Sequence, residues 1–226
     1  MDSSDYSLTI TKEYLDEYVK LEKIKENDQE LYDRFYSYYK TQFEMFRNTR
    51  NTLVHNRVNN SDYPLIVSKF MLDSIRIMIK KMSLKAINAC TPVQKIKTVD
   101  LDTPIYNALI LMNESNYSYL PVMQEGKVKY VVSEKAIVSI LTDNEEGILF
   151  DKDVTLKNYE KYFLLDGNPN EYYSFVDKDR LAFDVRDGFG KIKNNKKCGV
   201  VFITQNGKKD ESILGMVTLW DIAFSD

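Results

Sequence analysis

With 226 residues, the chain can form one large domain or two modest ones, and its hydrophobic content of 43% is enough for either to bury a core. The net charge of −3 gives no overall electrostatic field that would attract nucleic acid or an anionic membrane. The chain has two cysteines, Cys90 and Cys198, which are too few for a zinc site or a disulfide framework. We therefore expect partly buried thiols in a reducing compartment.

The N-terminal segment, MDSSDYSLTI, is acidic and polar where a signal peptide would be basic and then apolar. The longest apolar runs, such as residues 108–112, are too short to span a bilayer. These two features predict a cytoplasmic protein that does not enter a membrane.

The first 85 residues are expected to be helical, because they contain no glycine and a single proline, Pro64. From Thr11 onward, apolar residues recur at helical spacing and predict a first helix. A longer aromatic stripe between Leu31 and Leu53 predicts a second helix of unusual length that ends near residues 59–62. Pro64 then lies early in a third helix, whose apolar stripe includes Ile66, Phe70, Ile75, Met78, Ile79 and Met82. Such faces need one another, or a second subunit, to be buried.

After residues 89–92, short β-branched strands alternate with helices. A helix over 105–112, a strand over 119–123, a turn at Gly126 and a strand over 130–132 that continues into a helix form one unit. Residues 184–224 repeat this order, and an internal repeat of this kind predicts two copies that pack sheet against sheet.

The two copies carry recognisable motifs. The first reads TPIYNAL at 103–109 and YSYLPV at 117–122, and the second reads VVFIT at 200–204 and GMVTLWDI at 215–222. These motifs resemble the CBS family, and the resemblance covers roughly residues 88–226. It implies a disc of two motifs in which adenosine nucleotides bind in clefts between them.

In the CBS family, phosphate and ribose contacts come from a Thr/Ser-x-x-Asp step at the last strand-to-helix junction, which Thr218 and Asp221 match. A helix N-terminus and a hydroxyl suit a phosphate, and a carboxylate one turn further can accept both hydrogen bonds of a ribose diol. The same step also fits an ordinary helix cap that binds no ligand.

The resemblance implies further contacts to AMP, ADP or ATP as a regulatory ligand. They come from the entry to the first motif, from the edge of its strand and from the second motif: Thr91, Pro92, Lys97, Tyr117, Ser118 and Met216. The equivalent step of the first copy runs from Ser133 to Ala136 and lacks the carboxylate. We therefore expect the second, symmetry-related cleft to be empty or used differently.

The single histidine of the chain, His55, follows Arg50 with four residues between them, and Asn51 comes directly after the arginine. This pattern resembles the R-x4-6-H signature of HEPN domains, helical bundles that often act as metal-independent ribonucleases and usually work as dimers. At 100° per residue, Arg47, Asn51 and His55 lie on one helix face with Arg50 on its flank.

A ribonuclease needs a base near neutral pH to deprotonate a 2′-hydroxyl and cations to stabilise the developing phosphorane charge. His55 and Arg50 fit these catalytic roles, with Asn51 orienting them and Arg47 assisting with phosphate. A structural, hydrogen-bonding histidine is the alternative. One histidine without clustered cysteines disfavours a metal enzyme, and no glycine-rich loop precedes a helix as an NTPase requires.

The sequence thus predicts an α + α/β protein, an N-terminal helical bundle followed by a tandem CBS domain pair. Residues 1–87 form the HEPN-like domain, which dimerises, and residues 88–226 form the pair, with motifs at about 88–142 and 179–226 and an irregular insertion over 142–178. In a homodimer, nucleotide binding would control the cleavage or binding of RNA, without a required metal. The alternatives are a non-enzymatic sensor whose helices only dimerise or dock a partner, and a structural pair without a ligand.

Overall fold

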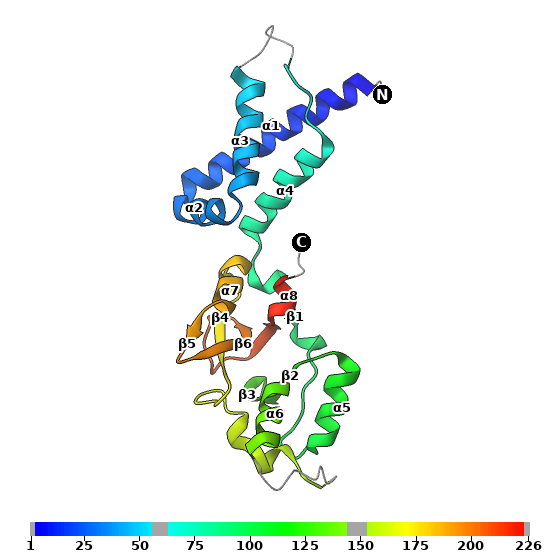
Figure 1. Cartoon of the computed structure of the whole chain (residues 1–226), viewed down its shortest axis with the longest axis vertical. Coiled ribbons are helices and arrows are strands. Elements are labelled where there is room, and N and C mark those ends of the chain that lie inside the picture. Colours follow the sequence, from blue (N-terminus) through cyan, green and yellow to red (C-terminus); the bar gives the residue numbers. More distant parts are fainter. Residues whose placement is uncertain (1–2, 56–62, 144–152, 224–226) are drawn as a thin grey trace. The chain divides into compact units, whose positions relative to one another are not determined.

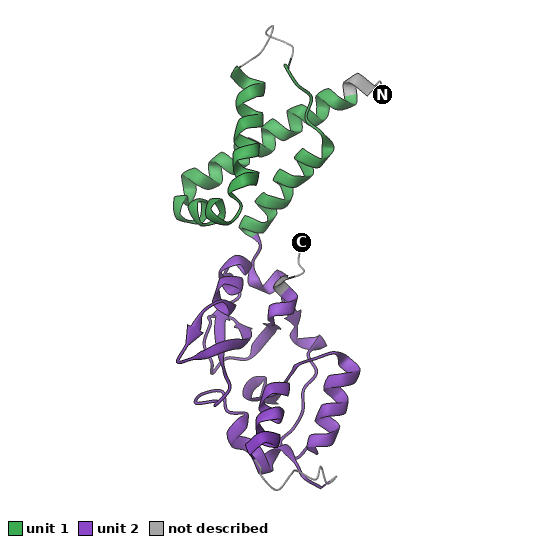
Figure 2. Cartoon of the chain, viewed as in Figure 1, with its two compact units in different colours: residues 1–83 green, residues 84–226 purple. Residues whose placement is uncertain are grey.

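The computed structural model describes residues 3–55, 63–143 and 153–223. The chain divides into two compact units, Met1–Ser83 (unit 1) and Leu84–Asp226 (unit 2), as Figure 2 shows. In the part of the chain that is described, no helix is both long enough and apolar enough to cross a membrane.

Unit 1 consists of helices. They are α1 (Ser3–Asn27), α2 (Gln29–Tyr38), α3 (Lys40–His55) and α4 (Lys69–Ser83), labelled in Figure 1. Their apolar stripes meet in a core whose fully buried side chains include Tyr14, Leu21, Phe35, Phe43, Phe46, Leu53 and Ile75. The buried Tyr14 hydroxyl donates to the carbonyl of Phe46 at 2.8 Å, and this bond ties α1 to α3.

The single long second helix predicted from the aromatic stripe is wrong, because the chain breaks at Tyr39 between α2 and α3. Tyr39 has φ −119° and ψ 34°, outside the helical region, although its N–H still bonds the carbonyl of Phe35. Because of this break, the side chains of Phe35 and Phe43 are both buried in the same core, although they lie on separate helices. The predicted end near residues 59–62 lies outside the described residues, since α3 is described as far as His55.

The other helix boundaries of unit 1 also differ from the prediction. The first helix begins at Ser3 rather than near Thr11. Pro64 precedes α4 instead of lying inside it, because α4 begins only at Lys69. Ile66 and Phe70, expected in the buried stripe, are 67% and 75% exposed, whereas Ile75, Met78 and Met82 are buried as predicted.

Unit 2 contains the predicted repeat of helix, strand, strand and helix. The first copy is α5 (Ile105–Ser115), β2 (Tyr119–Gln124), β3 (Lys127–Ser133) and α6 (Glu134–Asp143). The second is α7 (Ala182–Phe189), β6 (Lys196–Thr204), β7 (Ile213–Val217) and α8 (Leu219–Ala223). The intervening and flanking elements are η1 (Ala86–Asn88), β1 (Thr91–Pro92), η2 (Val93–Lys95), η3 (Leu156–Tyr162), β4 (Glu171–Asp177) and β5 (Ile192–Lys193).

Two sheets form the centre of unit 2 (Figure 1). One is the antiparallel pair β2–β3, and the other has the order β1-β7-β6-β4, with β5 also paired to β6. Strand β4 runs parallel to β6, and the other pairs are antiparallel. A buried apolar cluster joins side chains of both sheets, including Val128 and Val131 from the first and Phe202 and Met216 from the second. The expected packing of sheet against sheet is therefore present.

The segment 142–178, predicted to be irregular, contains regular structure. It includes η3 and β4, and β4 belongs to the larger sheet through its pairing with β6. Residues 144–152 of this segment lie outside the described residues. Its last part thus supplies the strand that precedes α7 and helps to build the second copy.

Candidate functional site

A cavity of about 230 Å³ lies in unit 2 where β1, the start of β2, the end of β7 and the start of α8 meet. We call it the first cleft. Its walls come from segments more than a hundred positions apart in the sequence: Thr91, Asn116, Tyr117, Ser118, Tyr119, Met216, Thr218, Trp220 and Asp221. Antiparallel pairing of Thr91 with Met216 brings the N-terminal edge of unit 2 to its last strand.

The carboxylate of Asp221 is the centre of the hydrogen bonds in the first cleft. Its Oδ2 accepts from the backbone N–H and the hydroxyl of Thr218, both at 2.7 Å, and its Oδ1 accepts from the Thr91 hydroxyl at 3.3 Å. The bond to the Thr218 N–H is one half of a capping box, so the cap interpretation describes part of this geometry. A carboxylate has about four lone-pair sites, which leaves capacity for a ligand hydroxyl.

Tyr117 and Ser118 reach the cleft because α5 ends abruptly at Asn116. Asn116 adopts the left-handed conformation with φ 54°, and the N–H of Tyr117 bonds the carbonyl of Met112 at 3.0 Å. Tyr117 also packs against the apolar core of the first copy, and its hydroxyl donates to the carbonyl of Lys95 at 3.5 Å. Its ring therefore belongs to both the core and the cavity wall.

The structure brings six of the eight predicted ligand contacts together: Thr91, Tyr117, Ser118, Met216, Thr218 and Asp221. Pro92 and Lys97 do not line the cavity. Pro92 pairs with Gly215 in the sheet, and Lys97 lies on the exposed surface. The sequence analysis missed Trp220, which is 68% exposed at the cavity although it stands directly between Thr218 and Asp221 in the predicted motif.

The repeat places a corresponding site, the second cleft, on the other side of unit 2. Leu164 forms an antiparallel β-bridge with Tyr130, and the N–H of Val131 donates to the carbonyl of Phe163 at 2.9 Å. This pairing corresponds to the antiparallel pairing of β1 with β7 at the first cleft. This register puts Phe163 at the position that corresponds to Thr91, and Ala136 corresponds to Asp221. Both side chains are fully buried.

Side chains of unit 2 fill the second cleft. Glu171, only 5% exposed, accepts hydrogen bonds from the hydroxyls of Tyr119 at 3.1 Å and Tyr173 at 3.2 Å. A Cβ on Gly199, the counterpart of Ser118, would lie 2.6 Å from Glu171 Oε2. Burial and the adjacent Glu171 carboxylate raise the pKa of both phenols, so they stay protonated as donors.

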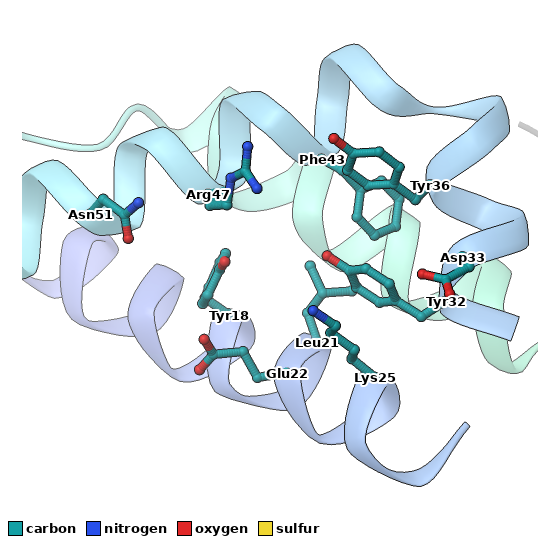
Figure 3. Close-up of a pocket in the computed structure, with 10 residues that line it drawn as sticks. All are labelled: Tyr18, Leu21, Glu22, Lys25, Tyr32, Asp33, Tyr36, Phe43, Arg47 and Asn51. Atoms are coloured by element: carbon teal, nitrogen blue, oxygen red, sulfur yellow. The ribbon is translucent and has the colours of Figure 1, made fainter. Parts of the chain in front are cut away.

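In unit 1, the Arg50 guanidinium contacts both other residues of the predicted R-x4-H pattern, Asn51 and His55. Its Nη1 lies 3.4 Å from both Asn51 Oδ1 and His55 Nε2, and its Nη2 lies 4.0 Å from Glu22 Oε1. His55 is exposed at the end of α3. Arg47 does not share these hydrogen bonds but lines a separate cavity with Asn51, shown in Figure 3.

Residues 84–143 match the family model described as the CBS domain. This segment is a CBS domain. CBS domains are generally regulatory and commonly bind adenine nucleotides. No curated protein matches the chain. Among the residues that the structure describes, no group of three or more His, Cys, Asp or Glu side chains is arranged to hold a metal ion.

Several solved structures that contain CBS domains resemble the chain. A hemolysin-like protein of Oenococcus oeni PSU is 14% identical, with 66% of this chain and 93% of that chain covered and a TM-score of 0.45. A CBS domain-containing protein of Bacillus anthracis str. Ames Ancestor is 15% identical, with coverages of 62% and 90% and a TM-score of 0.45. The CBS domain of a bacterial CNNM/CorC family Mg²⁺ transporter is 16% identical, with 70% and 84% covered and a TM-score of 0.45. At these values the likeness carries no argument about ligands or assembly.

Proposed function

We propose that the chain is a cytoplasmic regulatory protein in which unit 2, a CBS domain followed by a second CBS-like copy, binds one adenine nucleotide in the first cleft. The observation that carries this proposal is the convergence of the hydroxyls of Thr91 and Thr218 on the carboxylate of Asp221 at the wall of a cavity. AMP, ADP or ATP supplies a planar base, a ribose diol and phosphates, which match the side chains present.

Each part of the nucleotide has a partner in the first cleft. Asp221 accepts a hydrogen bond from a hydroxyl of the ribose diol at the lone-pair site that Thr91 and Thr218 leave open. The hydroxyl of Ser118 donates to phosphate while the Thr218 hydroxyl keeps its bond to Asp221, and the rings of Tyr117 and Trp220 flank the base. The cavity of about 230 Å³ is smaller than the roughly 300–1,000 Å³ of typical ligand pockets, so we expect the phosphates to extend out of it.

Isothermal titration calorimetry of the full chain with AMP, ADP, ATP and GTP tests this proposal. We expect one adenine nucleotide per chain and a loss of affinity of at least about tenfold in Asp221→Ala, because a charge-assisted acceptor is removed. Asp210→Ala, which removes an exposed carboxylate outside the first cleft, is the matched control and should bind as the wild type does. The absence of heat with every adenine nucleotide would contradict the ligand assignment.

We further propose that unit 1 is a HEPN-like domain that cleaves RNA without a metal and is controlled by the nucleotide bound to unit 2. The approach of the Arg50 guanidinium to His55 Nε2 and Asn51 Oδ1, each at 3.4 Å, supports this assignment. His55 removes the proton of the attacking 2′-hydroxyl, and Arg50 stabilises the charge that develops on the phosphorane. Asn51 holds the guanidinium, and Arg47 contacts an adjacent phosphate.

Unit 1 acts as a homodimer in this proposal, through an apolar face at and before α4. Phe70 and Ile77, seven residues apart on one helix face, are 75% and 49% exposed, and Ile66 is 67% exposed. Light scattering should give a dimer for the wild type and a monomer for Phe70→Ser. Val19→Ser changes a 48% exposed side chain on α1 and should remain dimeric. A monomeric wild type would refute dimerisation.

RNA cleavage in EDTA, with and without AMP or ATP, tests the catalytic assignment. We expect cleavage by the wild type, loss of cleavage in His55→Ala, and a change in rate on nucleotide addition that Asp221→Ala abolishes. Equal cleavage with and without saturating nucleotide would remove the coupling, since a ligand shifts an equilibrium only by its differential affinity. Identical behaviour of wild type and His55→Ala would favour a non-enzymatic nucleotide sensor.

A further inference from the structure

Unit 1 has an open pocket of about 370 Å³ between α1, α2 and α3, which lies within the size range of small-ligand sites. We call it the tyrosine pocket. Its walls are rich in aromatic rings and include charges of both signs: Tyr18, Leu21, Glu22, Lys25, Tyr32, Asp33, Tyr36, Phe43, Arg47 and Asn51. Lys25, Asp33, Arg47 and Asn51 are exposed, so the pocket opens to solvent and a ligand can enter it.

One end of the tyrosine pocket is aromatic (Figure 3). The rings of Tyr32 and Tyr36 each meet Phe43 edge to face, with centroids 5.0 Å and 5.8 Å apart. These mutual contacts hold the rings in place. Lys25 Nζ lies over the Tyr32 ring, 5.3 Å from its centroid, so a planar ligand would share this ring with the ammonium group. Burial raises the pKa of the Tyr32 hydroxyl to about 12, so at neutral pH it can donate a hydrogen bond without carrying charge.

The other end of the pocket is polar and contains Arg47 on α3 and Glu22 on α1, whereas Lys25 reaches Tyr32 at the aromatic end. Figure 3 shows Arg47 and Asn51 side by side along α3, with Asp33 at the opposite, aromatic end. Within the described ranges, Arg47 makes no ion pair, whereas Asp33 already accepts from Gln29 Nε2 at 2.7 Å. The lining carries two cations and two anions, so its net charge does not attract an anion. An anionic group is favoured locally, at Arg47.

This polar end continues into the Arg50–His55 pair. Asn51 lines the pocket and accepts from Arg50 Nη1 at 3.4 Å, and the same Nη1 lies 3.4 Å from His55 Nε2. A chain of nucleotides that places a scissile phosphate at Arg50 therefore has its neighbouring nucleotide at the mouth of the pocket. A planar aromatic end, a cation at the other end and this continuity together match a nucleotide unit better than an apolar or purely anionic ligand.

We infer that the tyrosine pocket holds one unstacked nucleotide of a single-stranded RNA, with its base against Tyr32 and Tyr36 and its phosphate at Arg47. This inference rests on the proposed action of unit 1 on RNA. A double helix does not fit, because its bases are paired and stacked and cannot enter a pocket. A free mononucleotide has the same chemistry as one nucleotide of an RNA strand. The experiment must therefore distinguish these two possible occupants of the pocket.

The test is fluorescence anisotropy of a short labelled RNA of randomised sequence, titrated with the full chain in EDTA. All proteins carry His55→Ala so that the RNA stays intact. We expect Tyr36→Ala and Arg47→Gln each to weaken binding at least about tenfold, in line with the loss of one base stack or one phosphate contact. Tyr38→Ala and Lys23→Gln change an exposed tyrosine and an exposed lysine outside the pocket and should stay within about twofold.

Three results would overturn the inference. RNA binding that is unchanged in both pocket variants would show that the pocket does not take the base. Equal affinity for duplex and single-stranded RNA would show that no base is unstacked. Competition by free mononucleotides at the same concentration as RNA, counted per nucleotide, would identify the pocket as a small-molecule site.

The cleavage assay separates this inference from the proposed catalysis. If His55→Ala abolishes cleavage while Tyr36→Ala and Arg47→Gln bind RNA normally, the pocket inference fails and the ribonuclease remains. If the pocket variants lose RNA binding and the wild type cleaves no RNA, the pocket inference holds and the catalytic assignment fails. Circular dichroism of each variant controls for loss of the helical fold.

Discussion

The two clefts of unit 2 each contain one carboxylate, but on different elements. In the first, Asp221 at the start of α8 meets the hydroxyls of Thr91 and Thr218 at the wall of a cavity. In the second, Glu171 on β4 meets the hydroxyls of Tyr119 and Tyr173 in the interior. Asp221, at a strand-to-helix junction, stays available to a ligand, whereas Glu171, at the start of the edge strand β4, is part of the core.

The residues at the positions around each carboxylate also differ between the two clefts. At the position of Asp221 the first copy has Ala136, and at the position of Thr91 the second cleft has Phe163. Both are fully buried in the apolar core of the first copy. Tyr119 connects the two sites, because its ring lines the first cleft while its hydroxyl donates to Glu171.

Restoring the missing carboxylate with Ala136→Asp should have the largest effect. The side chain of Ala136 is fully buried, so a charge there loses its hydration, and we expect a loss of about 2–4 kcal/mol in the free energy of unfolding. Urea denaturation measures it, and Val138→Asp, at a 56% exposed position on the same helix, should cost less than about 1 kcal/mol. A stable Ala136→Asp protein that binds two nucleotides would show that the second cleft is only a disabled copy of the first.

Removing the interior carboxylate with Glu171→Ala should cost about 2–3 kcal/mol, because it leaves the buried hydroxyls of Tyr119 and Tyr173 without their acceptor. Glu171→Gln keeps one acceptor oxygen and should cost less. Glu114→Ala, at an exposed position of α5, is the control. If Glu171→Ala unfolds at the same urea concentration as the wild type, the carboxylate does not stabilise the second cleft.

The first cleft could be predicted from the sequence because its main residues form a local pattern. Thr218 and Asp221 are three positions apart at the end of an apolar strand, and the internal repeat indicates the strands that bring Thr91 and Ser118 to them. The role of Glu171 could not be predicted, since its partner Tyr119 lies 52 positions away and its burial depends on how the two sheets pack.

In unit 1, the prediction of helices succeeded and the position of their break did not. The chain turns at Tyr39 without glycine or proline, and apolar residues continue at helical spacing across the turn. What separates α2 from α3 is the burial that Phe35 and Phe43 gain by facing the same core, which is a tertiary effect. The tyrosine pocket could not be predicted from the sequence for the same reason. It depends on tertiary packing, since its walls come from α1, α2 and α3.

Within the first cleft, the two threonines should not contribute equally. Thr218 donates to Asp221 at 2.7 Å and Thr91 at 3.3 Å, so the Thr218 hydroxyl makes the stronger bond. We expect Thr218→Val to weaken adenine nucleotide binding about fivefold to tenfold and Thr91→Val about twofold, by calorimetry. The opposite order would mean that Thr91 contacts the nucleotide directly while Thr218 serves only as a helix cap.

The hairpins of the two copies differ as well. Among the substitutions considered, one in the longer hairpin should have the smallest effect on the protein. Strands β2 and β3 are joined by Glu125 and Gly126, both with positive φ (51° and 75°), as in a two-residue type I′ turn. The longer β6–β7 connection is instead held by Glu211, whose carboxylate accepts from the side chain and N–H of Asn206 at 2.6 Å and 2.8 Å. The longer turn thus depends on a charge where the shorter one depends on backbone conformation.

These hydrogen bonds, with those from Asn206 foremost, lower the pKa of Glu211 from 4.5 to about 2. Because the folded pKa lies below the unfolded one, the stabilisation is present above about pH 4.5 and is lost as the pH falls through about 2. Glu211→Gln should therefore lower the melting temperature at pH 7 by less than about 3 °C, since the site is exposed. The difference between wild type and variant should shrink between pH 5 and pH 2, and a difference that stays constant over this range would show that the negative charge of Glu211 does not hold the turn.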